Sequence, residues 1–483
     1  MLLRQTFRYL PAQVMSPLIQ MATILVWAHL LPAGEVGVLT LVVAIQEISF
    51  GFFYMWWTQY TLRRFTAIRS AGRGDAYLRT ETAISAFLIV AQLVILFPVM
   101  SLYFDDQIDA YTQISVVFMI ISRSLTVFLS ERYRAESKVL PYTAIQILVP
   151  AFAIVSGTVL CLVWEKSVFA MALAFATAQF GGVAISLITG KLFRQPGWPD
   201  RRMLVEALKF GVPIMLASLL AIVANNGPRF IVDRYLGLEA AGMFAIAYGL
   251  GLRVASFASM MVTAGAYPLV IARMEKEGLE AAYLQLRQNT VLLLLVLMPA
   301  GIGLITINRS VVEILLPAHF AAIAFLVLPL SALTGIMRDV RNHTTNQVFL
   351  LQAKTAYATG LSAVDITLSL LFAVIGIMTW GAAGAVAGPL VATCVTLALS
   401  VTITRVKFAF KFPVFDLIKI TCAAALMSGV VSIFPVTSNP MHLGAQILLG
   451  GLTYGAVVVM AFWKDLSLRR RSMSSGNLPT TAE

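Results

Sequence analysis

Charged residues are scarce in this sequence. Only 12% of the 483 residues are Asp, Glu, Lys or Arg, whereas a soluble globular protein carries about 25%. Hydrophobic residues make up 59% of the chain and form long apolar runs from one end to the other. Runs of about 18 residues or more can cross a bilayer core of about 30 Å. The sequence therefore predicts an all-α polytopic membrane protein.

Cysteine and histidine are too few and too scattered to build a metal centre or a nucleophilic site. The three cysteines, Cys161, Cys394 and Cys422, lie in separate apolar runs and follow no disulfide or metal-binding spacing. The four histidines fall in predicted loops or at span ends, so no Ser or Cys nucleophile has an obvious base. We expect neither a metal, nor a cofactor, nor enzyme activity.

The chain also lacks a phosphate-binding loop of the form G-x-x-x-x-G-K-[ST], so it does not bind ATP in that way. No segment between the apolar runs reaches the roughly 50 residues of a small soluble domain. Any transport would therefore draw on an ion gradient, the membrane potential or the gradient of the substrate itself.

The apolar runs divide into fourteen predicted spans, each within the roughly 17–25 residues of a membrane helix. No small-residue cleavage site interrupts the first run, so we interpret it as a span rather than a signal peptide. The spans are 10–31, 36–58, 81–104, 111–130, 142–164, 168–190, 210–232, 239–262, 289–308, 321–338, 355–377, 382–404, 415–434 and 443–463.

The basic residues predict the orientation of these spans. If the N-terminus is inside, most of the 35 Lys and Arg residues lie in inner segments, including Arg132, Arg338 and Arg341. The outer loops hold only Lys166, Arg234 and Arg309. This positive-inside bias predicts that both termini are cytoplasmic. Because the net charge of +12 is spread over many inner segments, nucleic acid is not an expected partner.

The two halves of the chain show a weak internal repeat. At an offset of 205 residues, Leu31 matches Leu236 and Gly37 matches Gly242, and both stretches connect one span to the next in the same orientation. A parallel duplication of six spans places a pseudo-twofold axis along the membrane normal, with substrate sites between the halves.

The predicted organisation has five parts. It comprises an N-terminal six-helix lobe at 1–190, a cytoplasmic connection at 191–209, a C-terminal six-helix lobe at 210–404, an appended helix pair at 405–463 and a cytoplasmic tail at 464–483.

Three stretches carry a family resemblance. LLPAGEVGVLTLVVA at 30–44, RFIVDRYLGLEAAGMFAIAYGL at 229–250 and WGAAGAVAGPLVAT at 380–393 resemble polysaccharide-export flippases of the Wzx type. These belong to the multidrug/oligosaccharidyl-lipid/polysaccharide exporter superfamily. The resemblance implies two six-helix lobes that form a V-shaped cavity in the bacterial cytoplasmic (inner) membrane.

The resemblance also implies a cargo and partners. The cargo would be an undecaprenyl-diphosphate-linked oligosaccharide, moved to the outer leaflet for exopolysaccharide or lipopolysaccharide (O-antigen type) biosynthesis. The implied partners, besides membrane lipids, are a polysaccharide polymerase and a chain-length regulator.

Several charged residues lie inside predicted spans, where each is costly unless it has a partner or lines a cavity. They are Glu47, Arg123, Arg229, Arg253 and Asp365. A guanidinium remains charged and can bind two phosphate oxygens at once. The arginines therefore predict a diphosphate site, in which Glu47 neutralises Arg253 when the cavity is empty. The alternative is a permanent structural pair that joins the lobes.

Arg253 shares a helical face with Gly249, Ala245 and Gly242. Small residues on this face would leave room for a head group, or would serve close helix packing.

Polar residues also line one face of the seventh span. Asn226, Arg229 and Asp233 are spaced three and four residues apart, and Asn225 is adjacent. They are candidates to gate the outer mouth or to line a sugar path. The alternative is an Arg229–Asp233 pair near the membrane surface.

Asp365 has two open interpretations. It is a candidate to take up a proton or a cation and so couple transport to a gradient, or it is a neutral carboxyl bonded to a neighbouring helix. The glutamines within the spans, such as Gln92, Gln146 and Gln179, either bind sugars or join helices.

A flippase is thus the function that the sequence favours. A cation-coupled multidrug exporter of the same superfamily is the nearest alternative, in which Glu47 and Asp365 would dominate. A membrane glycosyltransferase or polymerase fits less well, because the outer loops are short.

Overall fold

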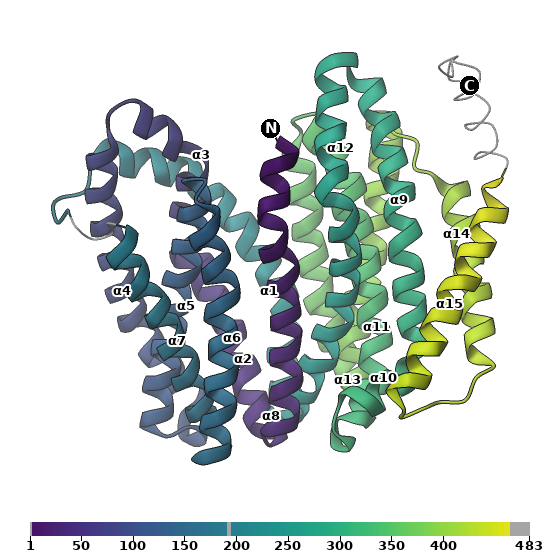
Figure 1. Cartoon of the computed structure of the whole chain (residues 1–483), viewed down its shortest axis with the longest axis horizontal. Helices are drawn as coiled ribbons and strands as arrows, with labels where there is room; N and C mark the ends of the chain where they lie inside the picture. The colour runs from purple at the N-terminus through teal and green to yellow at the C-terminus, as the bar shows by residue number, and fades with distance from the viewer. Residues whose placement is uncertain (1, 191–194, 464–483) are drawn as a thin grey trace. The chain divides into compact units, whose positions relative to one another are not determined.

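A computed structural model describes residues 2–190 and 195–463, and this part of the chain is helical with no β-strand. Figure 1 shows its helices in sequence colours. They are α1 (Leu2–Leu30), α2 (Ala33–Phe53), α3 (Met55–Ser70), α4 (Gly74–Phe104), η1 (Asp105–Gln107), α5 (Ala110–Ala135), α6 (Val139–Val163), α7 (Val168–Gly190), α8 (Arg201–Glu277), α9 (Leu279–Thr306), α10 (Asn308–Leu315), η2 (Ala318–Phe320), α11 (Ala321–Val340), η3 (Arg341–Thr345), α12 (Asn346–Leu351), α13 (Thr355–Phe408), α14 (Val414–Ser432) and α15 (Pro440–Ala461).

The helices account for every predicted span. Within the described residues, eleven helical segments are long and apolar enough to cross a membrane, and the apolar stretch Val14–Leu30 of α1 is somewhat shorter. Two of the eleven hold two predicted spans each, because α8 contains the seventh and eighth and α13 contains the eleventh and twelfth. The prediction of an all-α, multi-pass membrane protein is confirmed.

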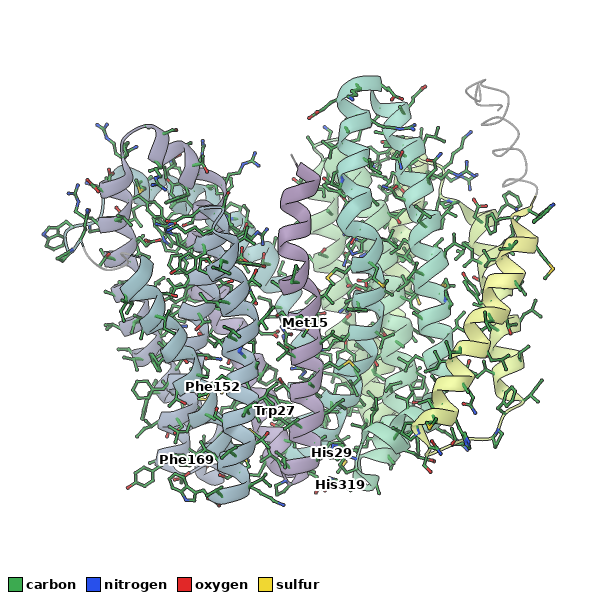
Figure 2. All side chains as sticks on the ribbon, in the orientation of Figure 1. Met15, Trp27, His29, Phe152, Phe169 and His319 are labelled. Atoms are coloured by element: carbon green, nitrogen blue, oxygen red, sulfur yellow. The ribbon has the colours of Figure 1, made fainter. Side chains whose placement is uncertain are left out.

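Apolar side chains on α6 form an exposed surface that suits a lipid environment. Leu148, Phe152, Val155, Val159 and Leu162 follow helical spacing along one face, and each exposes more than half of its surface. Phe152 is labelled in Figure 2. A continuous exposed stripe of this kind is unfavourable in water and is expected on a lipid-facing helix.

Each of the two longest helices is broken at a glycine. In α8 the non-helical residue is Gly237, with φ 84° and ψ 172°, and in α13 the break includes Gly381, with φ 60°. Positive φ is readily available only to glycine. On either side of the break in α13, the backbone of Gly384 packs closely against that of Gly376. Gly388 likewise packs against the backbone of Phe372 and Ala373. The G-x-x-x-G pattern at 384–388 therefore packs the two arms of one hairpin.

The repeat-equivalent glycines lie against one another. A Cβ atom on Gly37 would collide with the carbonyl of Leu238, and one on Gly242 would lie 2.7 Å from the carbonyl of Ala33. The offset of 205 converts the first contact into the second, because it relates Ala33 to Leu238 and Gly37 to Gly242. Such reciprocal contacts are what a twofold axis produces, and they support the weak sequence repeat.

The helices form two compact units. The first unit comprises residues 1–246 and 366–388, and the second comprises 247–365 and 389–483. The boundaries of these units differ from those of the predicted lobes, whose division at 190 and 210 remains a prediction. In the second unit, Ala424 and Ile420 of α14 pack with Leu297 of α9 and Ile336 of α11 in one buried cluster.

Candidate functional site

Three of the predicted site residues meet inside the first unit. The Nδ2 atom of Asn226 in α8 donates a hydrogen bond of 2.7 Å to Oε2 of Glu47 in α2. Arg123 of α5 lies close enough to interact electrostatically with Glu47. Asn226 is almost fully buried, Arg123 is half-buried and Glu47 is exposed. Apolar helices thus hold one acid, one base and one amide together, with the carboxylate accessible.

A buried glutamine fixes the spacing of this cluster. Nε2 of Gln92 in α4 donates to Ser49 at 2.7 Å and to Ser124 at 3.0 Å. Ser49 is two residues from Glu47 and Ser124 is adjacent to Arg123, so Gln92 ties together the two helices that carry the charges. Gln179 likewise accepts from Ser122, and Gln146 donates to Ser130. For these three glutamines, the structure supports the interpretation as links between helices.

Farther along α8, the carboxylate of Asp233 accepts a hydrogen bond of 2.6 Å from the hydroxyl of Tyr103 in α4. Both line a cavity of about 500 Å³, whose other lining residues are Gln107, Phe230, Arg234, Gly237 and Leu238. The cavity lies at the Gly237 break, where the sequence placed the outer mouth. Tyr103 was not predicted, because it lies at the end of its span, where a tyrosine is also expected as an ordinary interfacial residue.

Asp365, in the second unit, is held by an ion pair. Its Oδ2 accepts a hydrogen bond of 3.0 Å from Nη2 of Arg341, and its Oδ1 accepts hydrogen bonds from Thr393 and Thr396. Nη1 of Arg341 donates to Thr396 at 2.6 Å. Both charged side chains are about 95% buried. One interpretation expected Asp365 to be bonded to its neighbours, and it is. Its partners include a guanidinium, which that interpretation did not expect.

The placement of Arg341 corrects a sequence prediction. It was assigned to an inner loop that begins after residue 338, but the helix continues from α11 through the π-helical turn η3 into α12. The π-helical turn begins at Arg341. Insertions of this kind are rare and occur frequently at functional sites. A basic residue near a span end resembles a topogenic loop residue in sequence, so its buried acidic partner was missed.

Arg132 was also placed outside its predicted span, in an inner loop, but it lies within helix α5. It is almost fully buried within α5 and its Nε lies 2.7 Å from Oε1 of Glu81 in α4, while Nη1 contacts Glu136. Its guanidinium lies 4.1 Å from the centre of the Phe65 ring of α3. The hydroxyl of Tyr77 donates to Glu81. The i, i+4 spacing of Arg132 and Glu136 was the available sequence signal.

The remaining predicted residues lie on α8. Asn225 is exposed and Arg229 is half-buried, both in the first unit, whereas Arg253 is half-buried in the second unit. The expected neutralisation of Arg253 by Glu47 remains a prediction. Of the two interpretations of the small residues, the structure supports close helix packing at Gly242, because its Cβ position is filled by the backbone of α2.

Comparisons with known proteins agree with this architecture. A family model described as "Polysaccharide biosynthesis protein" matches residues 26–325. No curated protein matches the chain significantly.

Solved structures with the same fold include a lipid II flippase, MurJ, in an inward closed conformation (TM-score 0.74, 14% identity, 94% of this chain and 98% of that one). They also include inward-facing and outward-facing structures of a multidrug resistance MATE family transporter of the MOP superfamily. The inward-facing structure has a TM-score of 0.58 and 17% identity, with 82% of this chain and 96% of that one covered. The outward-facing structure has a TM-score of 0.59 and 16% identity, with 84% and 95% covered.

Proposed function

The chain belongs to the polysaccharide biosynthesis protein family, and from this premise we propose that it is a flippase for a lipid-linked sugar. The cargo is an undecaprenyl-diphosphate-linked oligosaccharide repeat unit, carried from the inner to the outer leaflet of the bacterial cytoplasmic membrane. The product would then enter the synthesis of a surface polysaccharide. Both termini are cytoplasmic in this proposal, and the halves alternate in access to the two sides.

The observation that carries the proposal is the placement of Arg123 beside Glu47 and Asn226 within apolar helices. An embedded guanidinium is unfavourable unless it performs a task or has a partner. In the empty protein Glu47 supplies the opposite charge. A diphosphate would accept two hydrogen bonds from the Arg123 guanidinium at once and so bind it more strongly than Glu47 does. Asn226 would then donate its hydrogen bond to a phosphate or sugar oxygen instead of to Glu47.

Other polar groups extend the path of the cargo in this proposal. Arg229 and Arg253 provide further positive charge along α8, and Asn225 offers an exposed amide to sugar hydroxyls. The cavity at Asp233 and Tyr103 has room for part of a sugar chain near the outer end. The lipid tail would remain in the bilayer, outside these helices.

Replacing Arg123 with alanine tests the proposal. A charge-assisted hydrogen bond contributes about 1.5–3 kcal/mol, so we expect export to fall by about tenfold or more. The measurement is the amount of diphosphate-linked oligosaccharide that accumulates on the cytoplasmic side in a strain lacking the protein. Wild type should clear it, Arg123→Ala should not, and Arg123→Lys should clear it partly because it keeps only the charge.

Lys276→Ala is the matched control, because this exposed residue lies in the last turn of α8, outside the apolar run. Membrane levels of all variants are compared first. Full clearance by Arg123→Ala would remove Arg123 from the substrate site. If the strain accumulates no lipid-linked sugar but loses tolerance to cationic compounds, the chain is instead a drug exporter.

A further inference from the structure

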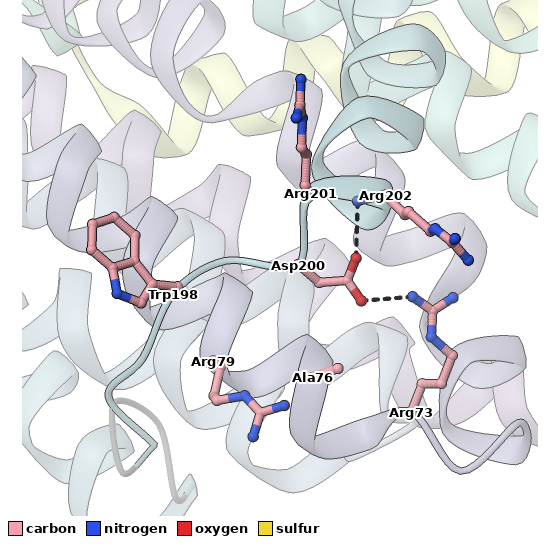
Figure 3. A pocket seen from close by; sticks show the side chains of 7 residues that line it. All are labelled: Arg73, Ala76, Arg79, Trp198, Asp200, Arg201 and Arg202. Carbon is pink, nitrogen blue, oxygen red and sulfur yellow. Dashed lines mark hydrogen bonds and ion pairs between the residues drawn. The ribbon is translucent and has the colours of Figure 1, made fainter.

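A second basic site lies away from the embedded charges, where the segment before α8 folds against the start of α4. It is a cavity of about 630 Å³, and Figure 3 shows its lining. The lining residues are Arg73, Ala76, Arg79, Trp198, Asp200, Arg201 and Arg202. All of them belong to the first unit. Four arginines and one acid in a single cavity produce a strong local positive charge.

Asp200 holds the wall of this cavity in place. Its Oδ2 accepts from Arg73 at 2.8 Å, and its Oδ1 accepts from the backbone N–H groups of Arg202 and Met203. Its own N–H donates to Thr80 of α4 at 2.9 Å. Hydrogen bonds from Met203 and Arg73 lower the pKa of the Asp200 carboxyl below its ordinary value. Asp200, the acid of the cavity, therefore uses its hydrogen bonds to hold the segment before α8 against α4.

The other three arginines keep their charge for a ligand. Within residues 2–190 and 195–463, no ion pair joins Arg79, Arg201 or Arg202 to a carboxylate. The segment before α8 packs on the alkyl part of Arg79 at Gly197. A Cβ atom placed on Gly197 would lie 3.0 Å from Cδ of Arg79. This contact supports the side chain and leaves its guanidinium group exposed.

One further feature favours an anion at a membrane surface. The Trp198 side chain is 93% exposed next to the arginines. An exposed tryptophan at the start of a membrane span is typical of the head-group region, where the ring sits between water and acyl chains.

We propose that this cavity binds the phosphate head group of an anionic phospholipid, with Trp198 inserted beside its acyl chains. Basic pockets at the inner ends of membrane helices bind such head groups, and in the predicted positive-inside orientation this cavity lies at the inner leaflet. The site is separate from the embedded cluster and does not depend on the proposed cargo. A bound phospholipid would hold residues 197–200 against α4.

The experiment counts the lipids that stay bound to the purified full-length protein by native mass spectrometry, in mixtures of phosphatidylglycerol and phosphatidylcholine. We expect Arg201→Gln/Arg202→Gln to weaken phosphatidylglycerol binding by at least about tenfold, since each arginine near the surface contributes substantially to anionic lipid binding. Phosphatidylcholine binding should not change. Raised salt should narrow the difference between wild type and the variant, because exposed charges are screened.

Brominated phosphatidylglycerol supplies a local probe, because bromine quenches tryptophan fluorescence at short range. The Trp198→Phe variant should lose the part of the quenching that comes from Trp198. The Arg201→Gln/Arg202→Gln variant should show weaker quenching than wild type. Arg273→Gln/Lys276→Gln is the matched control, since it removes two charges from the far end of α8. The proposal is overturned if both double variants lose binding equally, if the two lipids bind alike, or if only a polyprenyl diphosphate competes for the site.

Discussion

Arg341→Ala should lower the free energy of unfolding of the protein by about 3–5 kcal/mol, because it leaves Asp365 as an unpaired charge among buried side chains. The two threonines that also bond Asp365 cannot supply a positive charge. The measurement is the melting temperature of detergent-solubilised protein, followed by the amount that remains monodisperse after heating.

A double variant separates the orphaned charge from the loss of side-chain volume. Arg341→Met combined with Asp365→Leu removes both charges and keeps apolar bulk, so it should recover most of the stability that Arg341→Ala loses. Asp365→Asn alone should be destabilising, since it leaves the guanidinium without its carboxylate. If Arg341→Ala and wild type have the same melting temperature, the ion pair contributes nothing to stability.

Gly37→Ala should be the second severe change. The new methyl group would occupy the position of the Leu238 carbonyl in α8, so one of the two backbones has to move. Overpacking of a tight core costs about 1–3 kcal/mol, and a clash with backbone rather than with a flexible side chain belongs at the upper end. The same melting assay measures the effect.

Gly34→Ala is a close control for this change. Gly34 lies one turn earlier in α2 and has nothing within 4 Å of its Cβ position, so alanine should be tolerated there. Because Gly37 and Gly242 share one crossing, the double alanine variant should deviate from additivity. Similar melting of Gly34→Ala and Gly37→Ala would contradict the close contact.

Hydropathy was sufficient to predict where the membrane-length helices lie along the chain, because an apolar run that crosses a bilayer has to satisfy its backbone hydrogen bonds internally by forming a helix. The same reasoning failed near the ends of runs. Arg132 and Arg341 fell outside the predicted spans and were assigned to loops, yet both are buried within helices beside acids distant in sequence. The pairing of charges between helices depends on helix rotation, which hydropathy does not specify.

The candidate site was accessible to sequence reasoning only in part. Glu47, Arg123 and Asn226 stood out because a polar group within an apolar run is costly, and the structure brings these three together. Their supporting residue Gln92 and Tyr103, which bonds Asp233, were not identified as site components. Both side chains are compatible with ordinary helix packing, so only their partners reveal their roles.

The break at Gly381 reverses the chain with almost no intervening loop, because Gly376 and Gly384 pack against each other on either side of it. A turn this short offers a protease no extended segment to bind and leaves little surface for an antibody. An epitope tag inserted at Gly381 would separate the two arms that pack behind the turn. Tags are better tolerated in the longer connection between α14 and α15, around Val436–Asn439, where the described chain is not helical.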